Sequence, residues 1–496
     1  AAGLLGVAAT IGREFTADVL GAAAGVDEAR LIAALDELWR RRVVREQGLD
    51  AYDFAHEKIR EVAYAALSPA LRRHHHRRVA EVLARAGEAT LDELCGPIAE
   101  HHVRAGDVLA AVPWTLRAAD AAGRLHADAQ AIGLLDRMLN RLSEQPPTVR
   151  RDTLELQLLA ALPAPLGRAE GYASARLSAV HERALELSAR LGTELAPPLV
   201  RSLALTSTAG SDFAAAQRYG EQLLVRGTES GDEVLVVEAA YVLGIAAFWQ
   251  ARFGTAREHF ERAVRHYRPE RRALHVLRYG QDPRVVCLSR LANTLWFLHR
   301  PAAEVLATRD TALAYAEESG HLFSRVVARI FACVLALDMG DDDGLRTQVR
   351  ALAEIGHDSP GPPTWMPTEA FSGYVDVLDG RPQRGVGRCR RVIAALPGSQ
   401  PAPGMRAMLH RILLAAAERA GDTAEARWAA ERLLEMGGAA AIWREEASRA
   451  RDRLSEDTSR RTAAGGRPPR HPTATAGSPG GAGTAFEGPV RDARRK

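Results

Sequence analysis

Cysteine and aromatic residues are scarce in this sequence. Its 496 residues include 4 cysteines, and aromatic side chains make up 5% of the chain. The cysteines lie far apart, without a CxxC pair, at Cys95, Cys287, Cys333 and Cys389. This spacing excludes a zinc site that could be read from the sequence and gives no disulfide framework. We therefore expect a reducing, cytoplasmic location.

Long apolar runs are also absent. No stretch reaches the length that spans a bilayer, and no charged-then-apolar signal segment opens the chain, so we expect no membrane partner. The first residue is Ala1, and a helical pattern follows at once. We therefore expect the chain to be a natural truncation, a processed product or a fragment.

Net charge is small, because 65 basic residues stand against 62 acidic ones, which gives +3. The overall charge is therefore too small to indicate a nucleic-acid partner. The basic residues other than Lys58 and Lys496 are all arginine. The abundant residues are alanine, leucine, arginine and glutamate, which are strong helix formers. At this length the composition predicts an all-helical chain with several domains or a repeat array.

Catalytic motifs are missing too. A phosphate-binding loop needs Gly-Lys-Ser/Thr, but Lys58 follows Glu57 and Lys496 ends the chain. No Ser/His/Asp set, nucleophile elbow or HExxH motif is present. The sequence thus predicts no enzyme, no metal site and no cofactor in this chain.

Packing residues recur at helical spacing between Glu238 and Arg268. Ala256, Phe260 and Ala263 fall on one helical face, and Leu243 and Gly244 lie in the preceding helix. This pattern resembles the tetratricopeptide helical hairpin, in which small residues admit the facing helix.

The hairpin pattern repeats along the chain about every 40 residues. The anchor positions are Ala216, Ala256, Glu304, Gly344, Gly385 and Ala426. Residues 146–455 are therefore predicted to form a tetratricopeptide-like α-solenoid. Residues 456–496 hold almost no large apolar side chains after Arg460, and we expect a disordered tail.

Residues 1–70 differ from the rest of the chain in their sequence pattern, which includes strands as well as helices. The pattern predicts a short helix over 15–24, a longer one after Asp27, two strands at 43–46 and 51–54, and a further helix that ends before Pro69. This order is that of a winged-helix-like domain. Residues 71–145 then form linker helices and the first helical hairpins.

Three motifs carry a resemblance to a known family. They are Ile11-Gly12-Arg13-Glu14-Phe15, the stretch Asp53-Phe54-Ala55-His56 with Arg60, and Tyr279-Gly280-Gln281-Asp282-Pro283. Together they resemble the part that follows the ATPase core in bacterial AAA/STAND-type signalling ATPases, which are linked to cyclase or transcription-activator domains. The resemblance implies an upstream ATPase domain that would hold ATP or ADP and Mg²⁺.

Two groups of residues are candidate sites. The resemblance implies that His56, with Arg60, senses the nucleotide phosphate; the alternative is that His56 contacts only backbone or solvent. Arg290, Asn293 and Trp296 are expected on the helix that lines the solenoid groove, where solenoids bind ligands. For Asn293 an inter-repeat hydrogen bond is the alternative, and Asp282-Pro283 is expected to cap that helix.

We therefore expect a non-catalytic regulatory module of a signal-transduction ATPase. It would bind a protein or small effector in the solenoid groove and relay this to the upstream nucleotide switch. The alternative is a DNA-binding transcriptional regulator that uses the winged helix and the basic stretch from Arg72 to Arg78. The acidic residues of the helix after Asp27 make nucleic acid the less favoured partner.

Overall fold

Helices make up most of this computed structural model, which describes residues 2–48, 51–355, 362–396 and 403–463. The chain divides into two units, Ala1–Arg451 and Asp452–Lys496. Every element below lies in the first unit, except the end of the last helix. The helix α25 (Arg444–Ala463) continues past residue 455, and the rest of the predicted tail lies outside the described residues.

The N-terminal domain combines helices with a small sheet. Its elements are α1 (Ala2–Ile11), β1 (Glu14–Thr16), α2 (Ala17–Ala24), α3 (Glu28–Arg40), β2 (Val44–Glu46), β3 (Ala51–Phe54) and α4 (Glu57–Ala65). The strands form an antiparallel sheet in the order β1-β3-β2. Phe15, Leu20, Leu35 and Phe54 pack together in its core. Helix, helix, hairpin and helix follow in the predicted order.

The helix predicted over residues 15–24 starts later than expected. Phe15 belongs to β1, where it pairs with Tyr52, and α2 begins at Ala17. Thr16 caps α2, because its side-chain oxygen accepts a hydrogen bond from the backbone N–H of Val19 at 3.3 Å. Phe15, which the sequence pattern placed in the helix, thus lies in the sheet, where aromatic residues are favoured.

Seven helices connect this domain to the repeats. They are α5 (Pro69–Leu83), α6 (Glu88–Arg104), α7 (Val108–Arg124), α8 (Asp128–Ser143), α9 (Val149–Ala161), α10 (Pro163–Ala169) and α11 (Ala175–Leu191). The helix α6 contains Pro97 in its interior. The missing N–H of one proline removes one backbone hydrogen bond without ending this long helix.

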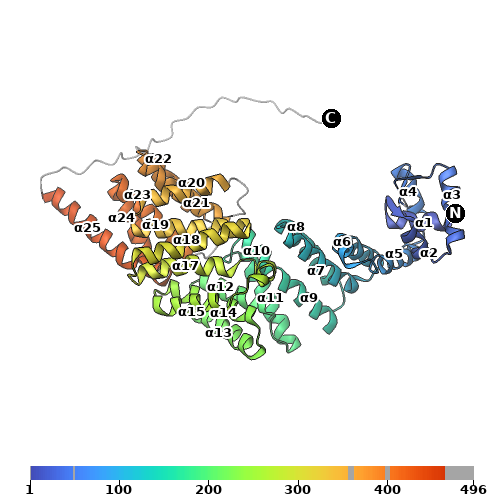
Figure 1. The fold of residues 1–496 in the computed structure, drawn as a ribbon, viewed down its shortest axis with the longest axis horizontal. Helices are drawn as coiled ribbons and strands as arrows, with labels where there is room; N and C mark the ends of the chain where they lie inside the picture. The colour runs from blue at the N-terminus through green and yellow to red at the C-terminus, as the bar shows by residue number, and fades with distance from the viewer. Residues whose placement is uncertain (1, 49–50, 356–361, 397–402, 464–496) are drawn as a thin grey trace, which may run out of the picture. The chain divides into compact units, whose positions relative to one another are not determined.

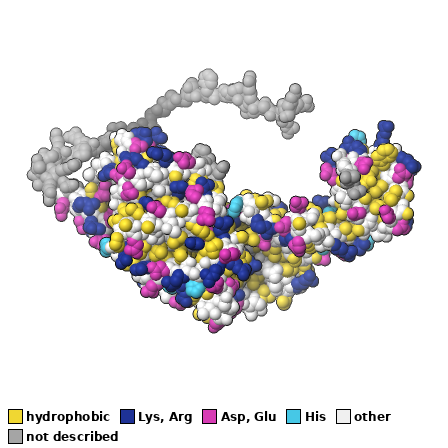
Figure 2. Space-filling view, viewed as in Figure 1, with side chains coloured by type: hydrophobic (Ala, Val, Ile, Leu, Met, Phe, Trp, Pro, Cys, Tyr) yellow, Lys and Arg dark blue, Asp and Glu magenta, His cyan; other side chains and the backbone are white. Residues whose placement is uncertain are grey.

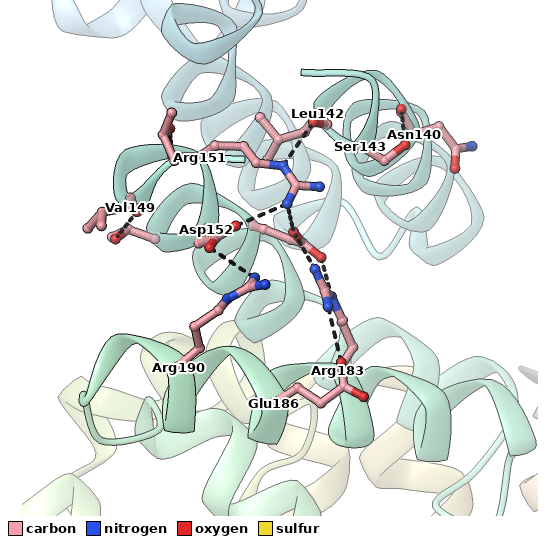
Figure 3. A network of polar contacts seen from close by, with 12 residues as sticks. Asn140, Leu142, Ser143, Val149, Arg151, Asp152, Arg183, Glu186 and Arg190 are labelled. Carbon is pink, nitrogen blue, oxygen red and sulfur yellow. Dashed lines mark hydrogen bonds and ion pairs between the residues drawn. The ribbon is translucent and has the colours of Figure 1, made fainter. Parts of the chain in front are cut away.

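A polar network ties the helices on both sides of the Pro146-Pro147 break (Figure 3). Arg151 of α9 donates from Nε to the carbonyl of Leu142 in α8 at 3.2 Å and pairs with Asp152 at 3.0 Å. Asp152 also pairs with Arg190 of α11 at 2.9 Å. Since Arg151 and Asp152 are buried, these contacts hold α8, α9 and α11 together.

Six helical hairpins follow, and they stack in sequence order (Figure 1). Their first helices form an inner layer, in which each contacts the next. The inner helices are α12 (Pro197–Ala209), α14 (Glu233–Trp249), α17 (Pro283–Phe297), α19 (Leu322–Met339), α21 (Pro362–Leu378) and α23 (Pro403–Ala420). The second helices form an outer layer of α13 (Phe213–Ser230), α15 (Phe253–His266), α18 (Ala302–Ser319), α20 (Asp342–Ile355), α22 (Pro382–Ala394) and α24 (Thr423–Glu435).

The repeat phase predicted from the sequence is confirmed. Each of the six anchor positions, from Ala216 to Ala426, lies in the first turn of an outer helix. The longer step between the second and third anchors reflects an insertion, which comprises η1 (Pro269–Arg271) and α16 (Arg272–Tyr279). After α24 the chain forms η3 (Gly437–Trp443) before α25.

Small residues set the distance between paired helices. At Gly244 an added Cβ would lie 2.6 Å from the Phe260 ring, so this ring fills the space beside the glycine. At Gly385 an added Cβ would overlap the carbonyl oxygen of Gly373 and lie 2.9 Å from the backbone nitrogen of Val377. In the second case the obstacle is backbone, which cannot rotate away.

Replacing Gly385 by alanine is therefore expected to destabilise the protein by about 1–3 kcal/mol, because α21 and α22 must separate. Gly387→Ala in the same helix is the matched control, since the nearest atom to its Cβ would be a flexible arginine nitrogen 3.7 Å away. That control should be neutral or stabilising by up to about 1 kcal/mol. Urea denaturation followed by circular dichroism measures both, and equal midpoints for the two variants would contradict this packing.

The described surface is mixed in charge. Figure 2 shows basic and acidic side chains interspersed over the face in view, with no extended field of one sign. Among the described residues, no helix combines the length and the apolar character needed to cross a membrane.

Candidate functional site

The inner layer contains a cavity of about 580 Å³, which we call the inner cavity. All six inner helices line it, together with the α10–α11 connection and the end of α22. Its volume lies in the range of pockets for small-molecule ligands. Helices far apart in the sequence meet around it, since α10 contacts α21, α12 contacts α23, and all four helices contribute to its wall.

The wall of the inner cavity is mainly apolar and aromatic. Its larger apolar and aromatic side chains are Tyr172, Leu205, Tyr241, Ile245, Trp249, Val286, Phe323, Val327, Ile330, Phe331, Met366, Leu396, Met405 and Met408. Methionine side chains adapt to ligands of different shape. Two charged residues join this wall, namely Glu170 and Arg290.

A buried polar network underlies one side of the cavity. Arg201 of α12 exposes 2% of its surface and donates from Nε to Glu238 of α14 at 3.0 Å. The same guanidinium donates to the Tyr172 hydroxyl at 2.6 Å and to the Gln281 side-chain oxygen at 3.1 Å. His275 of α16 lies 2.6 Å from the other Glu238 oxygen. Three helices and two connecting segments thus meet at one buried ion pair.

The Tyr279-Gly280-Gln281-Asp282-Pro283 motif supplies much of this network. The Tyr279 carbonyl accepts a hydrogen bond from Arg201 at 2.7 Å, and the Gln281 oxygen also accepts one from Tyr241 at 2.7 Å. Gly280 has φ +81°, and a Cβ there would lie 2.9 Å from the carbonyl oxygen of Ala164, so this position requires glycine.

The end of the motif starts α17 as predicted. Asp282 is the N-cap, because its side chain accepts from the backbone N–H of Arg284 at 3.0 Å, and Pro283 is the first helical residue. Burial raises the pKa of Asp282, and the hydroxyl of Tyr267 donates to its carboxylate at 3.3 Å. The motif is therefore a structural joint between α10, α12, α14 and α17.

Arg290 lies in the wall of the inner cavity without an ion-pair partner. It exposes 5% of its surface, its Nε has no hydrogen-bond partner, and the structure places no carboxylate of a described residue within 4.0 Å of its guanidinium. Aromatic rings surround it instead, with the Phe331, Phe248 and Trp249 centroids 3.9, 4.8 and 5.1 Å away. Burial lowers the pKa of Arg290 to about 10, so it stays protonated at neutral pH.

The other two residues predicted for the groove lie elsewhere on α17. Asn293 is buried outside the cavity wall, and its Nδ2 donates to the backbone carbonyl of Phe331 in α19 at 3.3 Å. This contact is the inter-repeat hydrogen bond weighed as the alternative. Trp296 is half-buried and also lies outside the cavity wall. The tryptophan that lines the cavity is Trp249 of α14.

Sequence reasoning missed Arg201 and Glu238, although a signal was present. Glu238 is the one charged residue between Val234 and Trp249, and Arg201 stands in a similarly apolar stretch of α12. An isolated charge on an otherwise apolar helix indicates a buried pair.

The residues predicted to sense a nucleotide lie at the start of α4. His56 is exposed at the N-cap position and makes no capping hydrogen bond. Arg60 is half-buried, donates from Nε to Glu57 at 2.7 Å and reaches the Ala9 carbonyl at 3.4 Å. Their nucleotide role stays a prediction.

The basic stretch from Arg72 to Arg78 is partly internal. Arg72 donates to the carbonyls of Tyr64 and Ala65 at the end of α4, and Arg78 donates to the carbonyl of Ala22. Two of the guanidinium groups considered for DNA therefore bind the N-terminal domain instead.

His76 within this stretch is fully buried and joins three helices. Its Nε2 lies 2.9 Å from the Tyr64 hydroxyl of α4, and its Nδ1 lies 2.8 Å from Nδ1 of His101 in α6. His101 in turn contacts the backbone of Ile11. Burial lowers the pKa of His76 to about 3 and that of His101 to about 4.

The cysteines have the environment of packing residues. All four are buried and free, and burial raises the pKa of each thiol, to about 12 for Cys389. Thiols of this kind are poor nucleophiles. Over the described residues, no three His, Cys, Asp or Glu side chains are grouped to hold a metal ion.

Comparison with protein-family models finds no match, and comparison with curated proteins finds none either. Among solved structures, the chain is similar to a Rap protein complexed with Competence and Sporulation Factor, at 14% identity and a TM-score of 0.44, over 70% of this chain and 99% of that one.

A second similar structure is a STAND protein with a tetratricopeptide repeat sensor from Pyrococcus horikoshii, at 11% identity and a TM-score of 0.48. The match covers 92% of this chain and 64% of that one. The tetratricopeptide repeat domain of P58(IPK) matches at 14% identity and a TM-score of 0.20, over 78% and 99% of the two chains.

Proposed function

We propose that this chain is a non-catalytic regulatory module that binds an effector in the inner cavity. The observation that carries the proposal is a cavity of about 580 Å³ lined by all six inner helices and containing a buried cation. A ligand that touches all six inner helices at once favours one arrangement of the repeats, because only an arrangement that brings those helices together offers every contact.

The proposal includes a relay to a nucleotide switch upstream, as the resemblance to signalling ATPases implies. The N-terminal winged-helix-like domain would carry this relay, because hydrogen bonds of Tyr64, His76 and His101 join α4 to α5 and α6, the first of the helices that lead to the repeats. ATP or ADP and Mg²⁺ would belong to the upstream domain. Tight stoichiometric binding of these nucleotides to this chain alone would contradict the assignment.

Binding of the neutral dye Nile red tests whether the inner cavity accepts ligands. We expect one saturable site per chain with blue-shifted emission, since the cavity wall is apolar. Val327→Trp fills the cavity and should abolish this site. Val225→Trp, at a position in α13 that is 55% exposed, is the matched control and should keep it. An absence of saturable binding, or equal binding by a folded Val327→Trp variant, would contradict the proposal.

A further inference from the structure

Arg290 is the one cation among the described residues that line the inner cavity, and no carboxylate of a described residue forms an ion pair with it. Burying a cation without a partner is costly, and natural proteins normally pair such groups. Arg290 instead has aromatic rings around it and no hydrogen bond from its guanidinium to any described residue. The ring faces offset part of the desolvation cost but leave the N–H donors of the guanidinium unused.

The acidic residues near Arg290 make no ion pair with it, although Oδ2 of Asp338 has no hydrogen-bond partner among the described residues. Asp338 attracts it only at longer range, because its carboxylate accepts from Trp443 at 3.2 Å and lies 3.6 Å from Arg411. Burial raises the pKa of Asp338 to about 7, so its negative charge is partly lost at neutral pH. Glu170, the acidic residue in the cavity wall, pairs with Arg176 at 3.5 Å and accepts from Ser174.

Resting on the function proposed above, we propose that Arg290 is the anion-binding residue of the inner cavity, and that the ligand is an apolar molecule with a single carboxylate. A planar guanidinium matches a carboxylate with two parallel hydrogen bonds. One negative charge balances the one cation in the wall, whereas a second would lack a partner and face Glu170. The apolar body of the ligand would fill the remaining volume between the aromatic and methionine side chains.

Displacement of Nile red by three ten-carbon probes tests this ligand class. Decanoate should displace the dye at a concentration about 10- to 100-fold lower than decan-1-ol, which corresponds to one hydrogen-bonded ion pair. Decyltrimethylammonium should be weaker still, because its charge repels Arg290. Equal potency of decanoate and decan-1-ol, or no displacement by either, would overturn the inference, while saturable dye binding would still support the proposed function.

Substitution of Arg290 tests the residue itself. Arg290→Met should raise the displacing concentration of decanoate by about 10- to 100-fold and leave that of decan-1-ol unchanged. Arg284→Met is the matched control, because Arg284 also stacks on rings, those of Tyr267 and Tyr315, but lies outside the cavity wall. Should Arg290→Met fail to fold, Arg290→Gln, which keeps polar atoms but carries no charge, must likewise lose the preference for decanoate. A folded variant of either kind that keeps the preference would overturn the assignment.

Two sources could supply such a carboxylate, namely a free acid or the C-terminus of a peptide. Acetyl-Leu-Leu-Phe with a free carboxylate and its C-terminal amide separate them. A peptide C-terminus is the ligand if the free-acid peptide displaces the dye at a lower concentration than decanoate does and the amide does not displace it. Displacement by decanoate alone would assign a free apolar acid.

Discussion

Replacing Arg201 by methionine is expected to lower the free energy of unfolding by about 3–5 kcal/mol. The substitution leaves Glu238, which is fully buried, with only His275 as a partner. It also removes donors to Tyr172, Gln281 and the Tyr279 carbonyl, so the joint between α12, α14 and α17 loses most of its hydrogen bonds. Urea denaturation followed by circular dichroism measures the shift.

Two further variants distinguish the effect of a buried ion pair from that of a solvent-exposed ion pair. Arg201→Met combined with Glu238→Gln should recover part of the loss, because no unpaired charge then remains buried. Arg300→Met removes an exposed pair with Glu304 on α18 and should cost less than about 1 kcal/mol. If Arg201→Met unfolds at the same urea concentration as Arg300→Met, the network does not hold the inner layer together.

Lowering the pH from 6.5 to 5 is expected to destabilise the protein by up to about 4 kcal/mol through His76 and His101 together. Their pKa values of about 3 and about 4 in the folded protein lie below that of an unfolded histidine. The unfolded chain therefore takes up protons first, and stability falls as the pH drops from 6.5 towards these values. Arg104 opposes protonation of both rings, whereas Glu100 favours that of His101.

Geometry explains why both rings stay neutral. His101 contacts the Ile11 backbone, which leaves its Nδ1 to accept a hydrogen bond from Nδ1–H of His76. Nε2 of His76 then accepts from the Tyr64 hydroxyl, so a proton on either ring breaks this chain. His76→Gln should reduce the pH slope of unfolding by roughly 1.4 kcal/mol per pH unit. His56→Gln, at an exposed position, should leave it unchanged, and equal slopes in the two variants would contradict this assignment.

The repeat architecture could be predicted from the sequence because its determinants are local. Gly244 and Phe260 meet across one hairpin, and Gly373 and Cys389, at the same spacing, meet across a later one. The capping role of Asp282 and Pro283 was predictable for the same reason, since a cap involves adjacent residues. Phe15 shows the limit of local reasoning, because its place in β1 depends on pairing with a strand almost 40 residues later.

The candidate site could be predicted only in part, because it depends on contacts between distant repeats. Arg290 was identified by its place on an inner helix, but the rings around it come from α14 and α19. The Arg201–Glu238 pair joins two hairpins and leaves no motif at fixed spacing. The contacts of α10 with α21 and of α12 with α23 join residues far apart in the sequence, so no local pattern predicts that these helices share one cavity.

Photolabelling tests most directly the central claim, that the inner cavity is the ligand site. A decanoate carrying a diazirine at its last carbon would be irradiated with the chain, and labelled peptides would be identified by mass spectrometry. The account predicts labels on peptides of α14, α17 and α19, and loss of these labels in excess decanoate. Labels confined to α1–α4, or spread over the surface and unaffected by excess decanoate, would contradict it.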